Sequence, residues 1–200
     1  MYLVKTPWWL RLFYSGYTWR MPSTDKAIYL SFDDGPHETA TPFVLDTLKA
    51  YQAKASFFCI GKNVQAHPAL YQRILSEGHT VGNHTQNHLN GWHTPNDQYL
   101  ANIQEASHHI QSQLFRPPYG RIKRSQAKQL PYQIIMWDVL SGDFDPLLTP
   151  EACLAYCIKH TEAGSIVVFH DSAKALSKLQ YALPKMLDYF SNQGFQFKAL

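Results

Sequence analysis

Two acidic residues stand side by side at the point where a short apolar segment ends. Asp33 and Asp34 come directly after residues 27–32, and Gly35 and Pro36 follow them. Adjacent side chains at the end of a strand point in different directions, so one carboxylate can bind a cation while the other stays free as a general base. The same four residues also suit a plain turn with solvated acids, because Asp, Gly and Pro favour turns.

Two histidines, His84 and His88, lie four positions apart just beyond a short segment at 79–83 that predicts a strand. Imidazoles at this spacing can face the same way across one turn and bind Zn²⁺. A pair of surface histidines is the plainer interpretation of the spacing alone. Two histidines and one carboxylate, with the remaining positions open, would form a catalytic metal site, and Asp33 or Asp34 could supply the carboxylate.

A third histidine, His170, follows the apolar run 165–169. A polar residue at the end of a buried strand is well placed to donate a proton, although a histidine at a loop entry can equally be structural. Asp138 and Asp143 lie near the end of another apolar segment. They could adjust the pKa of a histidine or cap the turn that follows.

The run Arg-Pro-Pro-Tyr-Gly at 116–120 has a stiff backbone, because its two prolines fix φ and its glycine permits a tight turn. An arginine held in this way could bind a carboxylate through two hydrogen bonds. The Tyr119 amide could point into the site as an oxyanion donor. The alternative is a polyproline-like turn on the surface.

The elements that must position these residues alternate along the chain. Runs rich in β-branched and aromatic residues predict strands at 27–32, 54–60, 79–83, 133–138 and 165–170, with a weaker candidate at 195–198. Capping residues and apolar periodicity predict helices at 43–52, 68–77, 97–114, 150–164 and 183–193. This order predicts an α/β fold with a parallel sheet, either open and doubly wound or closed into a barrel. In both, the chemistry lies at the carboxyl ends of the strands.

The composition suits a single globular domain. The chain has 200 residues, of which 45% are hydrophobic and 16% are charged, so it can form a packed core. Its net charge of +3 is spread along the chain, which excludes the basic footprint of a nucleic-acid-binding protein. Three cysteines cannot build a disulfide framework, so we expect the chain to be reduced or indifferent to redox state.

In these motifs the chain resembles the polysaccharide deacetylase family, the carbohydrate esterases of family 4 that share the NodB homology domain. Five motifs match in order: Ser-Phe-Asp-Asp-Gly at 31–35, His-Thr-Gln-Asn-His at 84–88, Arg-Pro-Pro-Tyr-Gly at 116–120, the segment 137–144, and Val-Phe-His at 168–170. The resemblance implies a distorted, incomplete (β/α) barrel. We expect residues 23–200 to form this single NodB-like domain, and residues 1–22 to be an aromatic segment packed on it.

The resemblance also implies the roles of the residues at the centre of the site. Asp34, His84 and His88 would hold one divalent metal ion, with Zn²⁺ the first choice and Co²⁺, Ni²⁺ or Mn²⁺ as alternatives. Asp33 would be the base that deprotonates the attacking water. Arg116 would orient Asp33 through an ion pair.

Further roles implied by the resemblance concern the oxyanion, the leaving group and the substrate. The Tyr119 amide would stabilise the oxyanion, and His170, with its pKa adjusted by Asp143, would protonate the departing amine. The expected substrate contacts are Pro118, Trp137, Phe144 and Val168. Phe144 and Val168 replace the Trp and Leu that usually form the acetyl-methyl pocket, and Leu140 replaces a frequent Asp. These changes leave the substrate preference open, but remove no presumed metal ligand or catalytic group.

The sequence therefore predicts a metal-dependent hydrolase that removes N-acetyl groups from the amino sugars of a poly- or oligosaccharide and releases acetate. Peptidoglycan, chitin-like chains and exopolysaccharide all contain such units, and the motifs do not choose among them. Two alternatives stay open. One is a hydrolase of the same fold that acts on another amide or an O-acetyl ester, and the other is a glycan-binding module without turnover.

The N-terminal segment carries Trp8, Trp9 and further aromatic residues beside a few basic ones. It could contact a membrane surface, but its moderate basicity and Pro7 favour packing against the barrel. No signal peptide or transmembrane segment is recognisable. We therefore expect a cytoplasmic or membrane-peripheral protein, although the family resemblance implies work outside the cytoplasm. The sequence predicts no particular oligomeric state.

Overall fold

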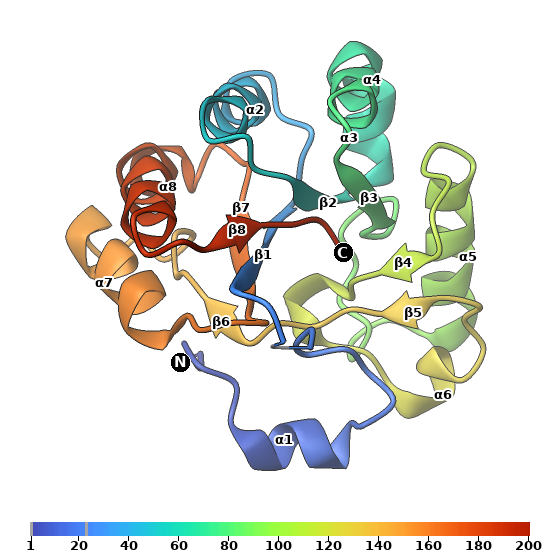
Figure 1. Cartoon of the computed structure of the whole chain (residues 1–200). Helices are drawn as coiled ribbons and strands as arrows, with labels where there is room; N and C mark the ends of the chain where they lie inside the picture. The colour runs from blue at the N-terminus through green and yellow to red at the C-terminus, as the bar shows by residue number, and fades with distance from the viewer. Residues whose placement is uncertain (1, 23) are drawn as a thin grey trace.

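The computed structural model describes residues 2–22 and 24–200 (Figure 1). Met1 and Ser23, at which the two expected segments begin, lie outside the described residues. The helices are α1 (Trp8–Phe13), α2 (Ala40–Ala50), α3 (Gly61–Ala66), α4 (Pro68–Ser76), α5 (Asn96–Ser107), α6 (Arg124–Ala127), α7 (Pro150–His160) and α8 (Leu176–Ser191), with a 3₁₀ turn at Pro118–Gly120. The strands are β1 (Ala27–Asp33), β2 (Ala55–Cys59), β3 (Thr80–Asn83), β4 (Leu114–Phe115), β5 (Gln133–Ile134), β6 (Val139–Leu140), β7 (Ile166–His170) and β8 (Gln196–Phe197).

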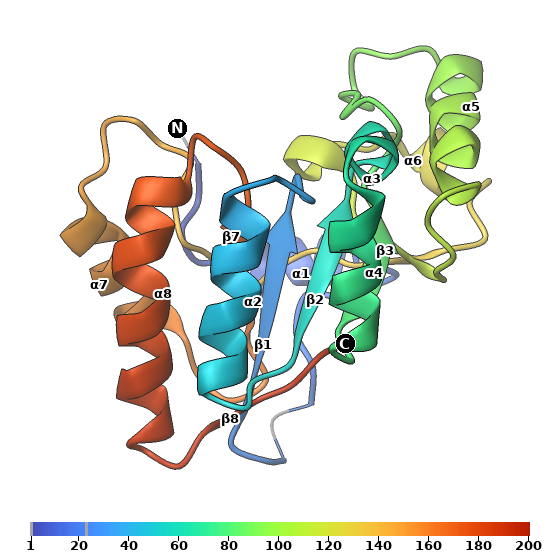
Figure 2. The same cartoon turned by 90° about the horizontal axis from the view of Figure 1, so that it is seen from above.

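The strands form one curled parallel sheet in the order β5-β4-β3-β2-β1-β7-β6, and β8 pairs with the start of β1. Helices α2, α4, α5, α7 and α8 lie around the outside of the curl (Figures 1 and 2). The expected distorted, incomplete (β/α) barrel is therefore confirmed. No described helix is long and apolar enough to cross a membrane.

The N-terminal segment lies between the two ends of the sheet path, β5 and β6. Isolated bridges join Thr18 to Ile135 beside β5 and Lys5 to Val139 in β6. The Thr6 N–H also donates to the Asp138 carbonyl at 2.8 Å. Residues 4–20 thus run along the open side of the curl and tie its two edges together.

The predicted strand at 133–138 is wrong in length, because only Gln133 and Ile134 form a strand, β5, and the next strand, β6, begins at Val139. The reason is visible in its hydrogen bonds. The Met136 N–H donates to Thr18, and the carbonyls of Ile135 and Met136 accept from the buried Arg116 side chain. A segment whose backbone groups bond to a side chain cannot continue a strand ladder.

Several predicted helices have wrong boundaries, and the helix expected at 150–164, for example, ends at His160. The helix expected at 97–114 ends at Ser107, and Leu114 instead begins β4, a strand of two residues that is too short to leave a periodic pattern. The helix expected at 183–193 begins seven residues earlier, at Leu176, and has Pro184 inside it. Its buried face, which includes Leu179 and Phe190, packs in the main core and outweighs the cost of an internal proline.

Candidate active site

The end of β1 separates its two acids by a change of backbone conformation. Asp33 is the last strand residue, and Asp34 follows with φ 81°, in the left-handed region that non-glycine residues seldom adopt. The Asp33 carboxylate consequently meets Arg116, whereas the Asp34 carboxylate meets His84 and His88. The turn thus gives two adjacent acids two different sets of neighbours.

Asp34, His84 and His88 form a cluster that could hold a metal ion, because one ligand atom from each lies within 4.8 Å of the others. Asp34 Oδ1 is 3.7 Å from His84 Nε2 and 3.2 Å from His88 Nε2. This buried oxygen has no hydrogen-bond partner among the described residues. A buried carboxylate oxygen without a donor needs a cation to compensate it, so the residues present fit a divalent metal.

The protonation states of these ligands also suit a cation. Burial lowers the pKa of His84 to about 4, so its imidazole is neutral at pH 7, the form that binds metals. His84 Nδ1 lies 2.7 Å from the Arg116 carbonyl, which as the acceptor fixes the proton on Nδ1 and leaves Nε2 facing Asp34. Burial raises the pKa of Asp34, but the neighbouring imidazoles of His88, His170 and His84 hold it well below its usual range.

Arg116 is fully buried, and its side-chain hydrogen bonds hold the guanidinium group against Asp33. Its Nη1 donates to Asp33 Oδ1 at 2.6 Å and to the Ser31 hydroxyl at 2.8 Å. The carbonyls of Ile135 and Met136 accept from the other guanidinium nitrogens. A buried charge is stable only when it is paired and hydrogen-bonded in this way. The Asp33 carboxylate is therefore fixed in place against a permanent cation.

His170, at the end of β7, is held by Asp143 at two points. Asp143 Oδ1 lies 2.8 Å from His170 Nδ1, and Asp143 Oδ2 accepts the His170 backbone N–H at 2.7 Å. Burial by itself lowers the pKa of His170, but Asp143, Asp34 and Asp33 outweigh it and raise the pKa to about 9. Nδ1 carries the proton shared with Asp143, so Nε2 is the nitrogen available for proton transfer.

The two candidate catalytic residues, Asp33 and His170, lie together because β1 and β7 are neighbours in register. Asp33 pairs with His170 across the two parallel strands. The cluster at Asp34, one residue further on, lies beside both. Carboxyl ends of parallel strands collect at one edge of a sheet, which is where such folds place their chemistry.

The residues expected to contact substrate lie in different surroundings. Tyr119, with φ 61°, is largely exposed and packs its ring over His88 at 4.6 Å between centroids. Phe144 packs edge-on against His170 at 5.1 Å. Val168 is completely buried in β7, and Pro118 is buried in the 3₁₀ turn. Tyr119 and Phe144 therefore lie at the rim of the candidate site, whereas Val168 lies below its surface.

Trp137 is half-buried and packs between the two smaller core clusters. Its ring lies over Gly120, where an added Cβ would sit 2.6 Å from Trp137 Cη2. Gly120 also has φ +65°. Only glycine meets both demands without strain, so Trp137 supports the 116–120 turn from below.

Two further polar residues, Thr41 and Asp171, are tied to the site in a manner that the sequence did not reveal. Thr41 lies in the first turn of α2, which begins at Ala40 rather than at the expected residue 43, and its hydroxyl donates to Asp171 at 2.5 Å. The other Asp171 oxygen accepts the Gly35 N–H at 3.0 Å. Burial raises the pKa of Asp171 to about 8, against the opposing bond from Thr41. These bonds fasten the turn after Asp34 to β7 and α2. The sequence signal was an acid directly after His170, with no indication of its partner.

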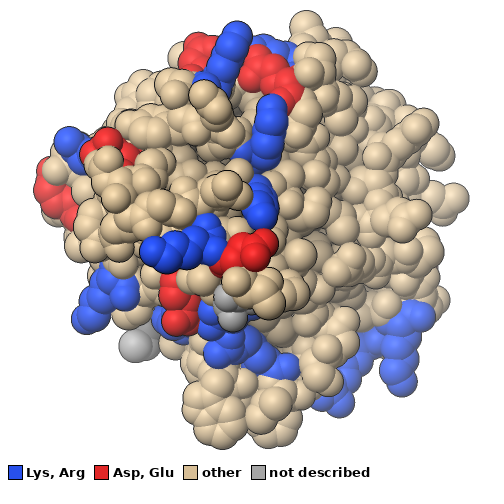
Figure 3. All heavy atoms as spheres, viewed as in Figure 1, with Lys and Arg blue, Asp and Glu red and all other residues tan. Residues whose placement is uncertain are grey.

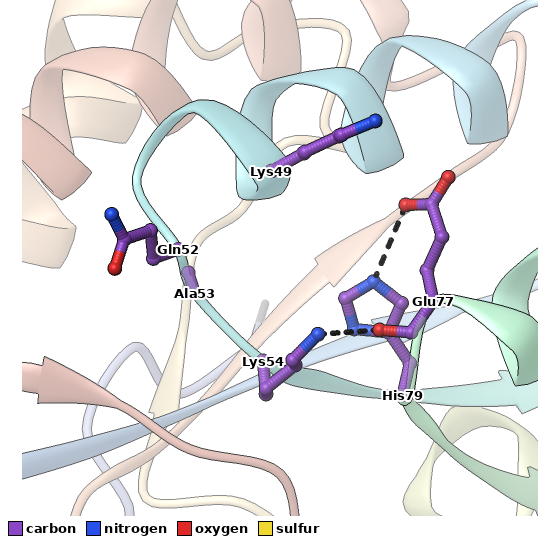
Figure 4. A pocket seen from close by; sticks show the side chains of 6 residues that line it. All are labelled: Lys49, Gln52, Ala53, Lys54, Glu77 and His79. Atoms are coloured by element: carbon purple, nitrogen blue, oxygen red, sulfur yellow. Dashed lines mark hydrogen bonds and ion pairs between the residues drawn. The ribbon is translucent and has the colours of Figure 1, made fainter.

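A hollow of about 320 Å³ lies away from these residues (Figure 4). Its lining consists of Lys49, Gln52, Ala53, Lys54, Glu77 and His79. Lys54 and His79 directly precede β2 and β3, so the hollow is at the amino ends of the strands, opposite the site. It takes no part in the chemistry considered below.

A carboxylate fixed by an arginine, a histidine paired with an aspartate and a cluster suited to a divalent cation, all at the carboxyl ends of a curled parallel sheet, are the groups that a hydrolase needs. Comparison with known proteins agrees. Residues 20–135 match the family model "Polysaccharide deacetylase". The chain is 37% identical to a peptidoglycan-N-acetylglucosamine deacetylase of Bacillus cereus, over 92% of this chain and 91% of that protein.

Other relatives are more distant or longer. Chitin deacetylase 2 of Saccharomyces cerevisiae is 31% identical over 78% of this chain and 54% of its own length. Among solved structures, the Bc1960 peptidoglycan N-acetylglucosamine deacetylase, in complex with an N-hydroxybenzamide, matches with a TM-score of 0.89 and 29% identity, covering 98% of this chain and 95% of that one. PdaC of Bacillus subtilis matches with a TM-score of 0.82 and 28% identity over 90% of each chain.

The chain belongs to the polysaccharide deacetylase family. The expected family and the expected enzyme class, a polysaccharide N-deacetylase, are therefore confirmed.

Proposed function

We propose that the protein hydrolyses the N-acetyl group of N-acetylglucosamine units in peptidoglycan, with a divalent metal ion held by Asp34, His84 and His88. The observation that carries the proposal is the unpartnered Asp34 oxygen beside two histidine nitrogens, next to a base and an acid in register. Peptidoglycan is proposed because the B. cereus relative, which this chain matches over nearly its full length, is named for that substrate.

Asp33 is proposed as the general base. Its Oδ1 accepts the bond from Arg116, which leaves Oδ2 to accept a proton from water. The ion pair fixes the carboxylate, so no reorganisation is needed when the proton moves. When bound, the divalent cation supplies Lewis-acid chemistry, polarising the acetyl carbonyl and making hydrolytic water more acidic.

His170 is proposed as the general acid. An amine leaves an amide only when it is protonated, and the pKa of about 9 keeps His170 charged at neutral pH. Asp143 holds the Nδ1 side, so Nε2 delivers the proton. Base and acid thus act from neighbouring strands on the two sides of one amide bond.

Tyr119 is proposed to stabilise the oxyanion through its backbone N–H. It lies in the first turn of the 3₁₀ helix, where N–H groups have no intrahelical partner. The N–H groups of Gly120 and Arg121 donate back to the two prolines before Tyr119, which closes the turn. The left-handed conformation of Tyr119 is therefore rigidly maintained.

The experiment measures acetate released from peptidoglycan, from N-acetylglucosamine oligomers and from an O-acetylated xylan. It compares enzyme loaded with Zn²⁺ or Co²⁺, enzyme treated with chelator, and the Asp33→Asn variant. Asp25→Asn is the matched control, because Asp25 is an exposed acid that pairs only loosely with Lys198 at 3.3 Å. Metal-dependent release from peptidoglycan that Asp33→Asn abolishes and Asp25→Asn retains is the expected result. Release from the O-acetyl ester alone would establish the esterase alternative, and no release from any substrate would contradict the enzymatic proposal.

A further inference from the structure

The short helix α1 turns most of its large apolar side chains outward. Trp8 is 68% exposed, Trp9 47%, Leu12 67% and Phe13 70%. Trp9 and Phe13 pack edge to face at 6.4 Å between centroids, so the rings form a ridge rather than isolated side chains. We call these four residues the α1 ridge. Contiguous apolar surface of this kind marks an interaction site.

The ridge is held rigidly, because the other side of the segment is anchored to the barrel. Leu10 packs against the cluster that contains Trp19. The Thr6 hydroxyl donates to the Trp137 carbonyl at 2.7 Å, and the Lys5 ammonium lies 2.8 Å from the buried Asp138 carboxylate. The outward rings are thus a fixed feature of the surface.

The surroundings of the ridge are basic. The sequence has no acid before Asp25, and none between Glu105 and Asp138. The second of these acid-free stretches contains α6 and its flanks, whose basic residues outside the core are Arg121, Lys123, Arg124 and Lys128. The Arg124 guanidinium lies 5.6 Å from the Tyr14 ring, which joins this basic region to the end of α1. Lys and Arg side chains, without Asp or Glu beside them, occupy the lower right edge of the molecule (Figure 3).

We propose that the α1 ridge and the basic residues around α6 bind the surface of a bilayer that contains anionic phospholipid. Trp, Phe and Leu are the side chains that insert between headgroups, and Trp prefers the interface itself. Lys and Arg at the edge of such a patch are attracted by the negative surface potential of the lipid.

Two other binding partners, a sugar chain and a second copy of the protein, fit the α1 ridge less well. A sugar chain needs hydrogen-bonding side chains beside the aromatic rings, and the single charged side chain of α1, Arg11, lies 3.8 Å from Asp138. A second copy of the chain, paired through the same face, would bring the basic residues around both α6 helices together, and like charges at a contact repel. An anionic lipid surface can bury the apolar rings and also attract the basic side chains.

The position of α1 is compatible with catalysis at a membrane. Figures 1 and 2 place α1 on the side of the sheet opposite α2. The catalytic residues lie at the carboxyl ends of the strands, so a bilayer against α1 leaves that end of the barrel uncovered. Binding would hold the enzyme close to an envelope substrate without occupying its site.

The test is flotation of the full chain with vesicles of phosphatidylcholine alone and of phosphatidylcholine with 30% phosphatidylglycerol. The wild-type protein is expected to float with the anionic vesicles and less with the neutral ones. The triple variant Trp8→Ala, Trp9→Ala, Phe13→Ala is expected to partition at least tenfold more weakly. The matched control, Leu147→Ala with Tyr189→Ala, removes side chains that are also exposed but lie elsewhere, and it is expected to float as the wild type does.

Acetate release from a short soluble substrate is measured in parallel and is expected to be the same in all these variants, because the α1 ridge touches no catalytic group. This readout keeps a failure of the membrane proposal separate from a failure of the proposed enzyme activity. The proposal is overturned if the wild type does not float, or if the triple variant floats equally well. It is also overturned if the ridge variant instead loses self-association in ultracentrifugation, or loses retention on insoluble peptidoglycan, while vesicle binding is absent.

Discussion

Replacing Asp143 by Asn removes one charge at the site and keeps the shape of the side chain. Asp143 is the strongest influence that raises the pKa of His170 to about 9, and burial acts in the opposite direction. Without the carboxylate, burial is opposed only by the more distant Asp33 and Asp34, so the pKa of His170 falls toward or below its ordinary 6.5. The acid then loses its proton in the working pH range.

The expected loss of activity follows from these two pKa values of His170, about 9 with Asp143 and about 6.5 without it. At pH 7.5 an imidazole with a pKa of about 9 is protonated roughly 30 to 1, and one with a pKa of about 6.5 is protonated roughly 1 to 10. Loss of a general acid lowers kcat by about 10²–10⁴-fold. A bound cation cancels the contribution of Asp34, so the alkaline limb of the loaded wild type lies below 9. The contribution of Asp143 remains, because it bonds to the Nδ1 side of the ring.

The assay is the pH dependence of kcat for acetate release. Activity that needs protonated His170 is lost as the pH rises through its pKa, so the alkaline limb of Asp143→Asn must move to lower pH by more than one unit. Asp145→Asn is the control, because that nearby carboxylate accepts a bond from the Tyr2 hydroxyl and does not touch His170. An alkaline limb of Asp143→Asn that superimposes on that of Asp145→Asn would refute the reasoning, whatever the loss of rate.

Two further predictions concern the metal ligands and the supporting turn. His84→Ala should weaken Zn²⁺ binding in calorimetry by more than the roughly 10–100-fold that loss of a supporting partner causes, whereas the exposed His93→Ala should bind Zn²⁺ as the wild type does. Gly120→Ala should lower the free energy of unfolding, measured in urea, by about 2–4 kcal/mol, because left-handed backbone strain adds to a clash with Trp137. Gly194→Ala has a similar φ of +78° and open space around its Cβ, so it should lose only about 1 kcal/mol. Equal losses in the two glycine variants would contradict the contact with Trp137.

Much of the fold could be predicted because its signals are local. The strands β1, β2 and β7 are runs of mostly apolar residues long enough to show a pattern, and each ends in or near a polar residue. The strands β4, β5 and β6 have two residues each, and no pattern of that length can be recognised. Their positions depend on long-range bonds, such as those from Arg116 to the backbone at 135 and 136.

The sequence by itself determined which chemical groups the protein has, and that strand ends present them, because residue type and spacing along one element are local properties. The tertiary structure decided how the groups are paired. Asp33 and His170 are far apart in the chain, and only the register of β1 with β7 makes them neighbours. The left-handed turn at Asp34 decided which acid faces Arg116 and which faces the histidines. The tertiary structure also determines that the α1 ridge faces outward, because the face of this six-residue helix that does not pack on the barrel is left exposed.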